Sequence, residues 1–499
     1  MNALLLALAS VCTSSPLRGI PLILTSCWKC AALLSQNSLA ERVLTPRDDG
    51  FQARLDSYYS ANAANPPRCM VLPQSTKDVA TTIQGLSELG CAFGMRSGAH
   101  SAFAGSNGLE GGVTIDFGYM NSTVYDPSTG IASIEPGSNW GDVYSALDRF
   151  GVTAVGGRAS VVGVGGFTTG GGYSFHTGNR GFACDNVVNI EVVLANGTIV
   201  NANRHENANL LRALKGGSGN FGLVTNISTR AVPSNKIWGG ITTYALNNTD
   251  KVVDAYTKFV NKMDDDPASQ AIVTLLYGKE GFSLVSVLTN SNAKSTAPAF
   301  NEFVRITNIS STARVGSVAE MVPEFTGPTP LGLYANWMTG TALHDQQLMY
   351  FILRTVQKYI NRMRLAAPSS NFELLTQFQP VTRSMVARGA EQGGNVLGLE
   401  RVVADGPALM WLLALTVDTA KNQERILPLL LQLERDINRY ADEKGTSRHW
   451  EFLNYSGLGQ NPILDYGKLE VGFMRSVSRE YDPQGVFQRL RKTGFHIPM

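Results

Sequence analysis

A histidine in a turn of small residues and a long glycine-rich run are the two features of this chain whose residues could do chemistry. The first is Arg96-Ser97-Gly98-Ala99-His100-Ser101, and the second is GVGGFTTGGG at 163–172. Exposed N–H groups in a small-residue turn can hold a diphosphate, and Arg96 can add positive charge. The glycine-rich backbone can lie close against a large, flat, anionic ligand. The two runs together predict a cofactor site, with His100 placed to meet the cofactor.

The glycine runs differ from the known nucleotide-binding motifs. With Gly163 and Gly165 in place, the third glycine of the dinucleotide fingerprint falls on Thr168, and no Gly-Lys-Ser/Thr follows. GSGNFG at 217–222 spells Gly-x-Gly-x-x-Gly, but it follows a predicted helix and opens a strand. An NAD-dependent dehydrogenase is therefore disfavoured. Tight turns alone remain an alternative, although six glycines in ten residues carry a heavy entropic cost.

The composition excludes some partners. The chain has 499 residues, enough for two or three domains. Its net charge is +2 and it has no Lys/Arg run, so we expect no nucleic-acid partner. Charged residues make up 16%, below the roughly 25% of typical soluble domains. The sequence indicates neither a metal site nor an oligomeric state.

The N-terminus resembles a secretory leader. MNALLLALASVCTSS has a short apolar core followed by small residues, and we place the leader at 1–25. Its apolar patches are too short to span a bilayer, which needs about 20 apolar residues. Asn-x-Ser/Thr sequons support secretion and glycosylation, and they begin at Asn121, Asn196, Asn226, Asn247, Asn308 and Asn454.

Short strands and helices must position the two runs. A strand over 93–96 leads straight into the turn that carries His100, and Ser75 is expected to cap the preceding helix. Asn196-Gly197 predicts a hairpin between strands 187–194 and 199–200. Residues 69–232 thus read as an α+β domain with irregular connections.

The second half of the chain has longer elements. Strands are expected at 237–244, 271–277 and 407–417, and helices at 250–263, 343–364 and 422–443. Segment 407–417 is almost wholly apolar, which predicts a strand buried on both faces. This pattern indicates a second α+β domain, a sheet covered by helices.

Several segments, taken together and in order, resemble one family. They are RSGAHS, GVGGFTTGGGYSFHTGNRGFACDNV, ALKGGSGNFGLVT, FLNYSGLGQNPILDYG and REYDPQGVF. The set resembles the vanillyl-alcohol oxidase/p-cresol methylhydroxylase superfamily, and within it the fungal berberine-bridge-enzyme-like FAD-linked oxidases. The resemblance implies an α+β fold with a PCMH-type FAD-binding domain at 30–233 and a substrate domain at 234–445. It also implies a C-terminal segment, 446–499, that packs on the FAD domain.

The resemblance also implies residue roles. His100 matches the histidine bonded covalently to the flavin. The diphosphate loop matches Arg96, Ser97, Gly98, Ala99, Ser101, Gly105 and Ser106. Backbone packed on the flavin matches Gly163, Val164, Gly165, Gly166, Thr168, Gly170, Gly171 and Gly172. Further cofactor-side positions match Asp185, Asn186, Val187, Gly219, Gly222, Val224 and Asn454.

The chain departs from the family at three places. Many relatives attach FAD a second time through a cysteine, and that position is Ala159 here, so we expect a single histidyl linkage. A histidine that some relatives carry inside the glycine run is Phe167 here. The plant alkaloid branch has a carboxylate or amide on the buried strand 407–417, where positions 411–413 are Trp, Leu and Leu.

The resemblance implies an enzyme that oxidises a small phenol, alcohol, or alkaloid- or polyketide-like intermediate in secondary metabolism. Hydride would pass to flavin, with O2 as the final acceptor. Tyr455 is the first candidate for the catalytic base, followed by Tyr173 and His176. Trp337, Trp411 and Tyr334 are compatible with an apolar pocket. The alternatives are a carbohydrate oxidase, which Ala159 mildly disfavours, and a flavoprotein catalysing a non-redox cyclisation.

Overall fold

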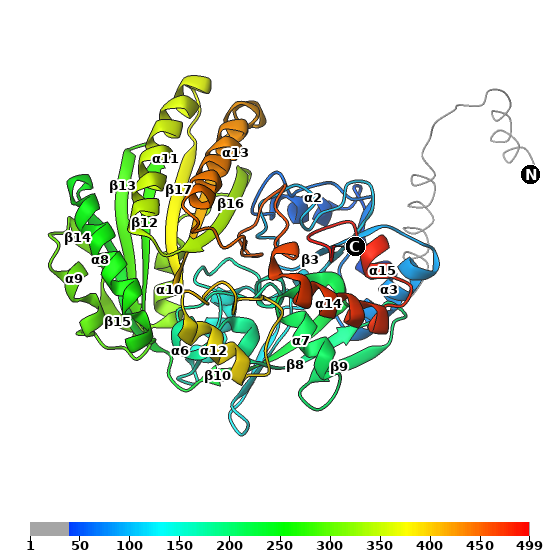
Figure 1. The fold of residues 1–499 in the computed structure, drawn as a ribbon. Coiled ribbons are helices and arrows are strands. Elements are labelled where there is room, and N and C mark those ends of the chain that lie inside the picture. The colour runs from blue at the N-terminus through cyan, green and yellow to red at the C-terminus, as the bar shows by residue number, and fades with distance from the viewer. Residues whose placement is uncertain (1–38, 499) are drawn as a thin grey trace, which may run out of the picture.

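The computed structural model describes residues 39–498 as an α+β fold built on three sheets (Figure 1). The α+β class predicted from the sequence is confirmed. The predicted leader at 1–25 lies outside the described residues. Within residues 39–498, no helix is both long and apolar enough to cross a membrane.

The first sheet delivers the histidine turn. Its strand order is β1 (Val43–Leu44), β2 (Cys69–Val71), β4 (Val113–Asp116), β3 (Phe93–Arg96), and β4 runs parallel to both β2 and β3. Helix α3 (Thr76–Glu88) connects β2 to β3, and the Ser75 hydroxyl accepts from Asp78 N as its predicted cap. Helix α2 (Asp49–Asp56) precedes β2. Because β3 ends at Arg96, the turn with His100 begins at the carboxyl edge of this sheet.

The second sheet is antiparallel and carries the glycine run on its connections. Its order is β5 (Thr123–Asp126), β6 (Ile131–Ile134), β10 (Leu223–Val232), β8 (Val187–Val193), β9 (Ile199–Asn203), and β7 (Thr153–Ala154) pairs with β10. Its helices are α4 (Trp140–Asp148), α5 (Val164–Thr169), α6 (Thr177–Arg180) and α7 (Ala208–Gly217). The predicted Asn196-Gly197 hairpin joins β8 to β9, and Gly197 has the positive φ of 81° that such a turn requires.

The third sheet forms the second half of the fold. The order along its main path is β14 (Ser310–Ser311), β11 (Lys236–Tyr244), β13 (Gly281–Asn290), β12 (Ser269–Gly278), β17 (Glu373–Val381), β18 (Ala408–Val417) and β16 (Tyr334–Leu343), and β15 (Arg314–Ser317) pairs with β11. Strand β18 is buried on both faces, as its apolar sequence predicts.

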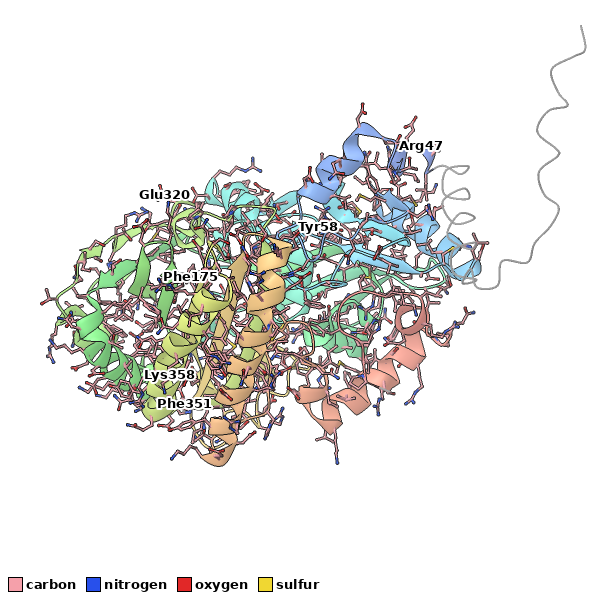
Figure 2. The ribbon with its side chains drawn as sticks, turned by 90° about the horizontal axis from the view of Figure 1, so that it is seen from above. Arg47, Tyr58, Phe175, Glu320, Phe351 and Lys358 are labelled. Atoms are coloured by element: carbon pink, nitrogen blue, oxygen red, sulfur yellow. The ribbon has the colours of Figure 1, made fainter. Side chains whose placement is uncertain are left out.

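Three long helices cover one face of the third sheet: α8 (Thr249–Asn261), α11 (Gln346–Ala366) and α13 (Ala420–Glu443) (Figure 1). Phe351 of α11, labelled in Figure 2, stacks on Tyr440 of α13 with ring centroids 3.9 Å apart. Shorter helices are α9 (Asn301–Val304), α10 (Val318–Thr326) and α12 (Arg383–Glu391). The opposite face of the third sheet lines a cavity.

The C-terminal segment returns to the first two sheets. Helices α14 (Lys468–Tyr481) and α15 (Val486–Arg489) follow the third sheet in sequence, and α14 packs on α7. The chain then runs beside β3: Phe93 N donates to Leu490 O, and Lys492 N donates to Phe93 O, each over 2.9 Å. The last described residues are thereby fixed next to the strand that carries the histidine turn.

The structure adds elements that sequence patterns did not predict. Part of the glycine run forms helix α5, whereas we had expected irregular backbone there because glycine disfavours helices. Strands β13, β16 and β17 were also missed. Their residues mix polar and apolar types on both faces, because one face meets helices and the other lines a cavity.

Candidate functional site

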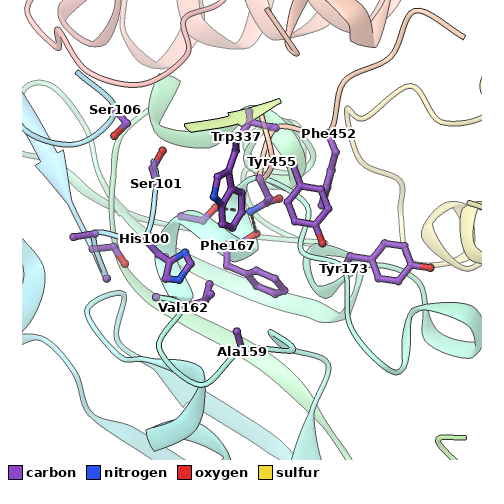
Figure 3. Close-up of a pocket in the computed structure, with 18 of the residues that line it drawn as sticks. His100, Ser101, Ser106, Ala159, Val162, Phe167, Tyr173, Trp337, Phe452 and Tyr455 are labelled. Atoms are coloured by element: carbon purple, nitrogen blue, oxygen red, sulfur yellow. Dashed lines mark hydrogen bonds between the residues drawn. The ribbon is translucent and has the colours of Figure 1, made fainter. Parts of the chain in front are cut away.

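A cavity of about 630 Å³ lies between the first two sheets and the open face of the third sheet; we call it the central cavity (Figure 3). It brings together residues far apart in the sequence. The predicted site residues on its wall are Arg96, Ser97, Gly98, Ala99, His100, Ser101, Ser106, Gly163, Gly165, Gly166, Tyr173, Gly219, Gly222, Val224, Asn454 and Tyr455.

The histidine turn and the glycine run touch through their backbones. A Cβ placed on Gly98 would lie 2.4 Å from the Cα of Gly163, which no side chain tolerates. Ala99 follows with a left-handed φ of 53°, which directs the chain into the cavity wall. The Ser97 hydroxyl donates to Pro136 O and fixes the start of the turn. The glycines here are therefore required by close approach of two chain segments.

His100 lies on the cavity wall among aromatic rings. Its imidazole stacks on Tyr59 with ring centroids 4.0 Å apart. It also meets the edge of Trp337, with centroids 5.9 Å apart (Figure 3). Burial lowers the pKa of His100 to about 4. The imidazole is therefore neutral near pH 7 and keeps a nitrogen lone pair that can form a covalent bond.

The Arg96 guanidinium, predicted to add positive charge for a diphosphate, is held by protein groups. It forms an ion pair with Asp116 over 3.4 Å, donates to Ser57 Oγ and Arg54 O, and lies 4.1 Å from the centroid of the Tyr58 ring. Asp116 is shared with Arg54, which donates to both carboxylate oxygens over 2.8 and 2.6 Å. Strand alternation turns the Arg96 side chain toward α2.

Arg491 supplies the uncompensated charge at this end of the cavity. It is 3% exposed, lines the cavity, and donates to Asn220 Oδ1 over 2.8 Å and to Phe495 O over 2.9 Å. No carboxylate of residues 39–498 pairs with it. Burial lowers the pKa of Arg491 to about 9, so it remains charged near neutral pH. Sequence reasoning missed this residue because it belongs to no motif and reaches the site through the C-terminal segment.

Polar atoms without partners also point to a ligand at this end. Ser106 Oγ and Asn107 Oδ1 are buried, line the cavity and have no hydrogen-bond partner within the described chain. Buried polar atoms normally form hydrogen bonds, so a polar ligand in the cavity would supply the partners that these two atoms lack. Together with Arg491, they fit the anionic, hydroxyl-rich diphosphate and ribityl portion of FAD.

The glycine run forms the floor of the cavity. Gly163, Gly165 and Gly166 line it, and a Cβ on Gly166 would project into open space. Asn454 holds the end of the run, since its Nδ2 donates to Phe167 O over 3.1 Å and its Oδ1 accepts from Gly172 N over 3.3 Å. Because the three glycines that line the cavity have no side chains, a planar ring can lie flat against their backbone.

The other end of the cavity holds two tyrosines and an arginine. Tyr455 Oη accepts a hydrogen bond from Arg158 Nη2 over 2.7 Å and one from Gln379 Nε2 over 3.1 Å. The Arg158 guanidinium also lies 4.4 Å from the centroid of the Tyr173 ring. Tyr173 itself donates to Pro380 O over 2.8 Å, and burial raises its pKa. Tyr455 differs from Tyr173 in that its oxygen accepts from two donors, while its own hydroxyl can donate to Gln379 Oε1 over 3.3 Å.

Other predicted residues lie outside the cavity wall: Gly105, Val164, Thr168, Gly170, Gly171, Gly172, His176, Asp185, Asn186 and Val187. His176 is 3% exposed, occupies the N-cap position of α6 without a side-chain cap hydrogen bond, and has its pKa lowered to about 4 by burial. It is not part of the wall of the central cavity. The Asp185 carboxylate accepts from Phe182 N and Asn395 Nδ2, which is a role in fixing the chain.

The third sheet contributes an apolar wall. Strand register aligns Ile241, Val287 and Ile272 in one row, and Val285, Thr274, Gln377 and Leu412 in the next. On β18 the side chain facing the cavity is Leu412. Trp337 lines the cavity, whereas Trp411 and Tyr334 do not. No Asp or Glu of residues 39–498 is part of the wall, so no carboxylate base is available there.

Comparisons with known proteins agree with this geometry. Residues 67–203 match a family model described as an FAD binding domain. The FAD-dependent monooxygenase sdcF of Emericella nidulans is 34% identical, covering 94% of this chain and 98% of the relative. The bifunctional solanapyrone synthase of Alternaria solani is 31% identical over 94% of this chain and 88% of its own.

Solved structures share the fold at low sequence identity. The 6-hydroxy-D-nicotine oxidase of Arthrobacter nicotinovorans superposes with a TM-score of 0.75 at 20% identity, covering 91% of this chain and 97% of that one. A berberine bridge enzyme variant in complex with (S)-reticuline gives 0.75 at 15% identity, covering 95% and 99%. Xylooligosaccharide oxidase from Myceliophthora thermophila gives 0.74 at 18% identity, covering 95% and 99%.

Proposed function

Because this chain belongs to the family of FAD-dependent oxidoreductases that includes the fungal monooxygenase 34% identical to it, we propose that it oxidises a small, largely apolar organic substrate in secondary metabolism. When bound, FAD supplies the hydride acceptor, and O2 is the proposed final acceptor. The observation that carries the proposal is the placement of the Tyr455 phenol in the same cavity as His100, opposite an apolar sheet face.

The cofactor is proposed to be attached once, through His100. The imidazole faces the cavity in its neutral form, which supports bond formation. Ala159 also lines the cavity, at the position where relatives carry a second linking cysteine, and its methyl group has no nucleophile (Figure 3). Ser106, Asn107 and Arg491 would hold the diphosphate and ribityl groups.

Tyr455 is the proposed base that takes a proton from the substrate. Its phenol oxygen accepts hydrogen bonds from Arg158 and Gln379, and its hydroxyl lies 3.3 Å from Gln379 Oε1 as a donor. The two donors to the oxygen would stabilise a phenolate. The surrounding wall excludes water through apolar side chains of the third sheet, including Ile272, Leu276 and Leu412. Exclusion of water strengthens the electrostatic effect of Arg158 on that oxygen.

The apolar wall also separates the candidate functions. A sugar presents hydroxyls on every side, and a row of Ile, Val and Leu side chains cannot satisfy them, so a carbohydrate oxidase is disfavoured. Cyclisation without redox chemistry remains the second candidate, because solanapyrone synthase, named as bifunctional, is 31% identical and an apolar cavity of this size could fold a flexible chain.

We also propose that the protein passes through the secretory pathway and is glycosylated. Four sequon asparagines are exposed: Asn121, Asn196, Asn247 and Asn308. Cys91 is disulfide-bonded, which is typical of oxidising compartments. Asn226 lies half-buried within β10 and Asn454 is on the cavity wall, so neither suits a glycan.

The test uses protein from a secretory host, precipitated with acid. Yellow colour that stays in the pellet, and moves to the supernatant in His100→Ala, would support the histidyl linkage. His205→Ala, at an exposed histidine, is the matched control and should behave as wild type. Peroxide release on an aromatic and polyketide substrate panel then tests oxidase activity. A colourless wild-type protein that gains no colour with added FAD would contradict the proposal.

A further inference from the structure

One terminal nitrogen of Arg158, at the central cavity, has no hydrogen-bond partner among residues 39–498. Its Nη2 donates to Tyr455 Oη and to Gln379 Oε1, whereas its Nη1 is buried and has no hydrogen-bond partner in the described chain. No carboxylate of residues 39–498 forms an ion pair with it. Although Arg158 as a whole is only partly buried, a buried N–H group without a partner costs free energy unless a ligand completes its hydrogen bonds.

The charges around the cavity leave Arg158 uncompensated after the cofactor is considered. Three arginines line the wall, and no acidic residue of the described chain does. Arg96 forms an ion pair with Asp116, which it shares with Arg54, and Arg491 lies with Ser106 and Thr493 at the end where the diphosphate is proposed to bind. Arg158 lies instead with Tyr173 and Tyr455, at the proposed catalytic end.

We propose that Arg158 binds an anionic oxygen of the substrate, so that the substrate is an organic acid: a carboxylate or the enolate of a 1,3-dicarbonyl. This inference deepens the proposed function and rests on it. The planar guanidinium can use Nη1 for the anion while Nη2 keeps Tyr455 in place. One side chain thus positions both the substrate and the phenol that takes its proton.

The wall next to Arg158 fits the rest of such a substrate. Gln377 and Thr274 provide a short polar strip, and beyond them Leu375, Leu276 and Ile272 form an apolar face. An anionic head at Arg158 with an aromatic or alkyl body on this face would leave no buried polar group of the substrate unpaired. A neutral hydrocarbon or alcohol would leave Nη1 without a partner.

The experiment is a titration of the flavin-loaded enzyme with small probes, followed through the visible flavin spectrum. Benzoate and dimedone represent the carboxylate and the enolate, and benzamide and cyclohexanone are their neutral counterparts. We expect a saturable spectral change with at least one anion and a much weaker one with its neutral counterpart. The anion that binds more tightly shows whether the substrate's charge comes from a carboxylate or from an enolate.

Variants assign the effect to Arg158. Arg158→Gln should weaken binding of the anion by about 10-fold or more, because a charge-assisted hydrogen bond is lost. Arg158→Lys should recover part of the affinity, since it restores the charge without the planar fork. Arg149→Gln, at an exposed arginine outside the cavity, should bind as wild type. A wild-type flavin spectrum in each variant shows that the site is folded.

Two results would overturn the inference: wild type that binds the neutral probes as tightly as the anions, or Arg158→Gln that binds the anions as tightly as wild type. Either result, with flavin bound and reducible, leaves the proposed oxidoreductase function standing. Failure to load flavin at all would instead contradict the proposed function itself.

Discussion

The Arg158 guanidinium lies 2.7 Å from the phenol oxygen of Tyr455, although 297 residues separate the two in the sequence. Arg158 follows the second sheet's short strand β7, and Tyr455 belongs to the C-terminal segment. Gln379, from the third sheet, completes the cluster. The proposed catalytic end is therefore assembled from all three parts of the chain, and it exists only in the complete fold.

Tyr455→Phe should lower the rate of flavin reduction by about 100-fold or more while leaving flavin content unchanged, because general base catalysis typically contributes that much. The measurement is anaerobic flavin bleaching after mixing with substrate. Tyr119→Phe, at a tyrosine that is 55% exposed, should react at the wild-type rate. A Tyr455→Phe variant that bleaches as fast as wild type would assign the base elsewhere.

Gly98→Ala and Gly166→Ala should fail in different ways. The added methyl at Gly98 meets the backbone of Gly163, so overpacking should cost about 1–3 kcal/mol and lower the melting temperature of the flavin-free protein. The methyl at Gly166 enters open space in the cavity, so folding should be normal and flavin loading impaired. Thermal melts and the ratio of flavin to protein absorbance measure both. Equal melting temperatures for the two flavin-free variants would contradict the close contact.

Stability should fall as pH rises from about 4 to about 7 because of two carboxyl groups in the C-terminal segment. Burial raises the pKa of Glu451 to about 7 and that of Asp465 to about 6. The folded chain then holds protons that the unfolded chain has already released, so folding loses free energy through this window. Melting temperatures across the range should be flatter in Glu451→Gln/Asp465→Asn than in wild type. Glu280→Gln, at an exposed carboxylate, should keep the slope.

Glycosylation should follow exposure of the sequons. Four sequon asparagines are exposed and can therefore carry a glycan: Asn121, Asn196, Asn247 and Asn308. Replacing any one of them by Gln should remove the mass of one glycan from protein made in a secretory host. Asn226→Gln should leave the mass of the glycans unchanged, since Asn226 is half-buried within β10. Intact-protein mass spectrometry before and after deglycosylation is the measurement. A glycan on Asn226 would contradict the described packing of that strand.

Local patterns in the sequence predicted several helices, strands and turns around the proposed cofactor-binding residues. Ser75, strand 93–96 and the Asn196-Gly197 turn each act through neighbours in the chain, and each is found in the structure. Arg158 and Arg491 were not predicted, because their roles depend on partners hundreds of residues away. The Arg96 charge was assigned to a ligand because the sequence does not reveal that Arg96 forms an ion pair with Asp116.

The contact between β3 and residues 490–492 makes one wall of the central cavity depend on docking of the C-terminal segment. Arg491, Thr493 and Phe495 all line the cavity and reach it only through this contact. A folding intermediate that already displays His100 but has not docked this segment lacks that part of the wall. The complete cavity therefore forms late in folding, and the proposed attachment of flavin would report that the C-terminal segment has docked.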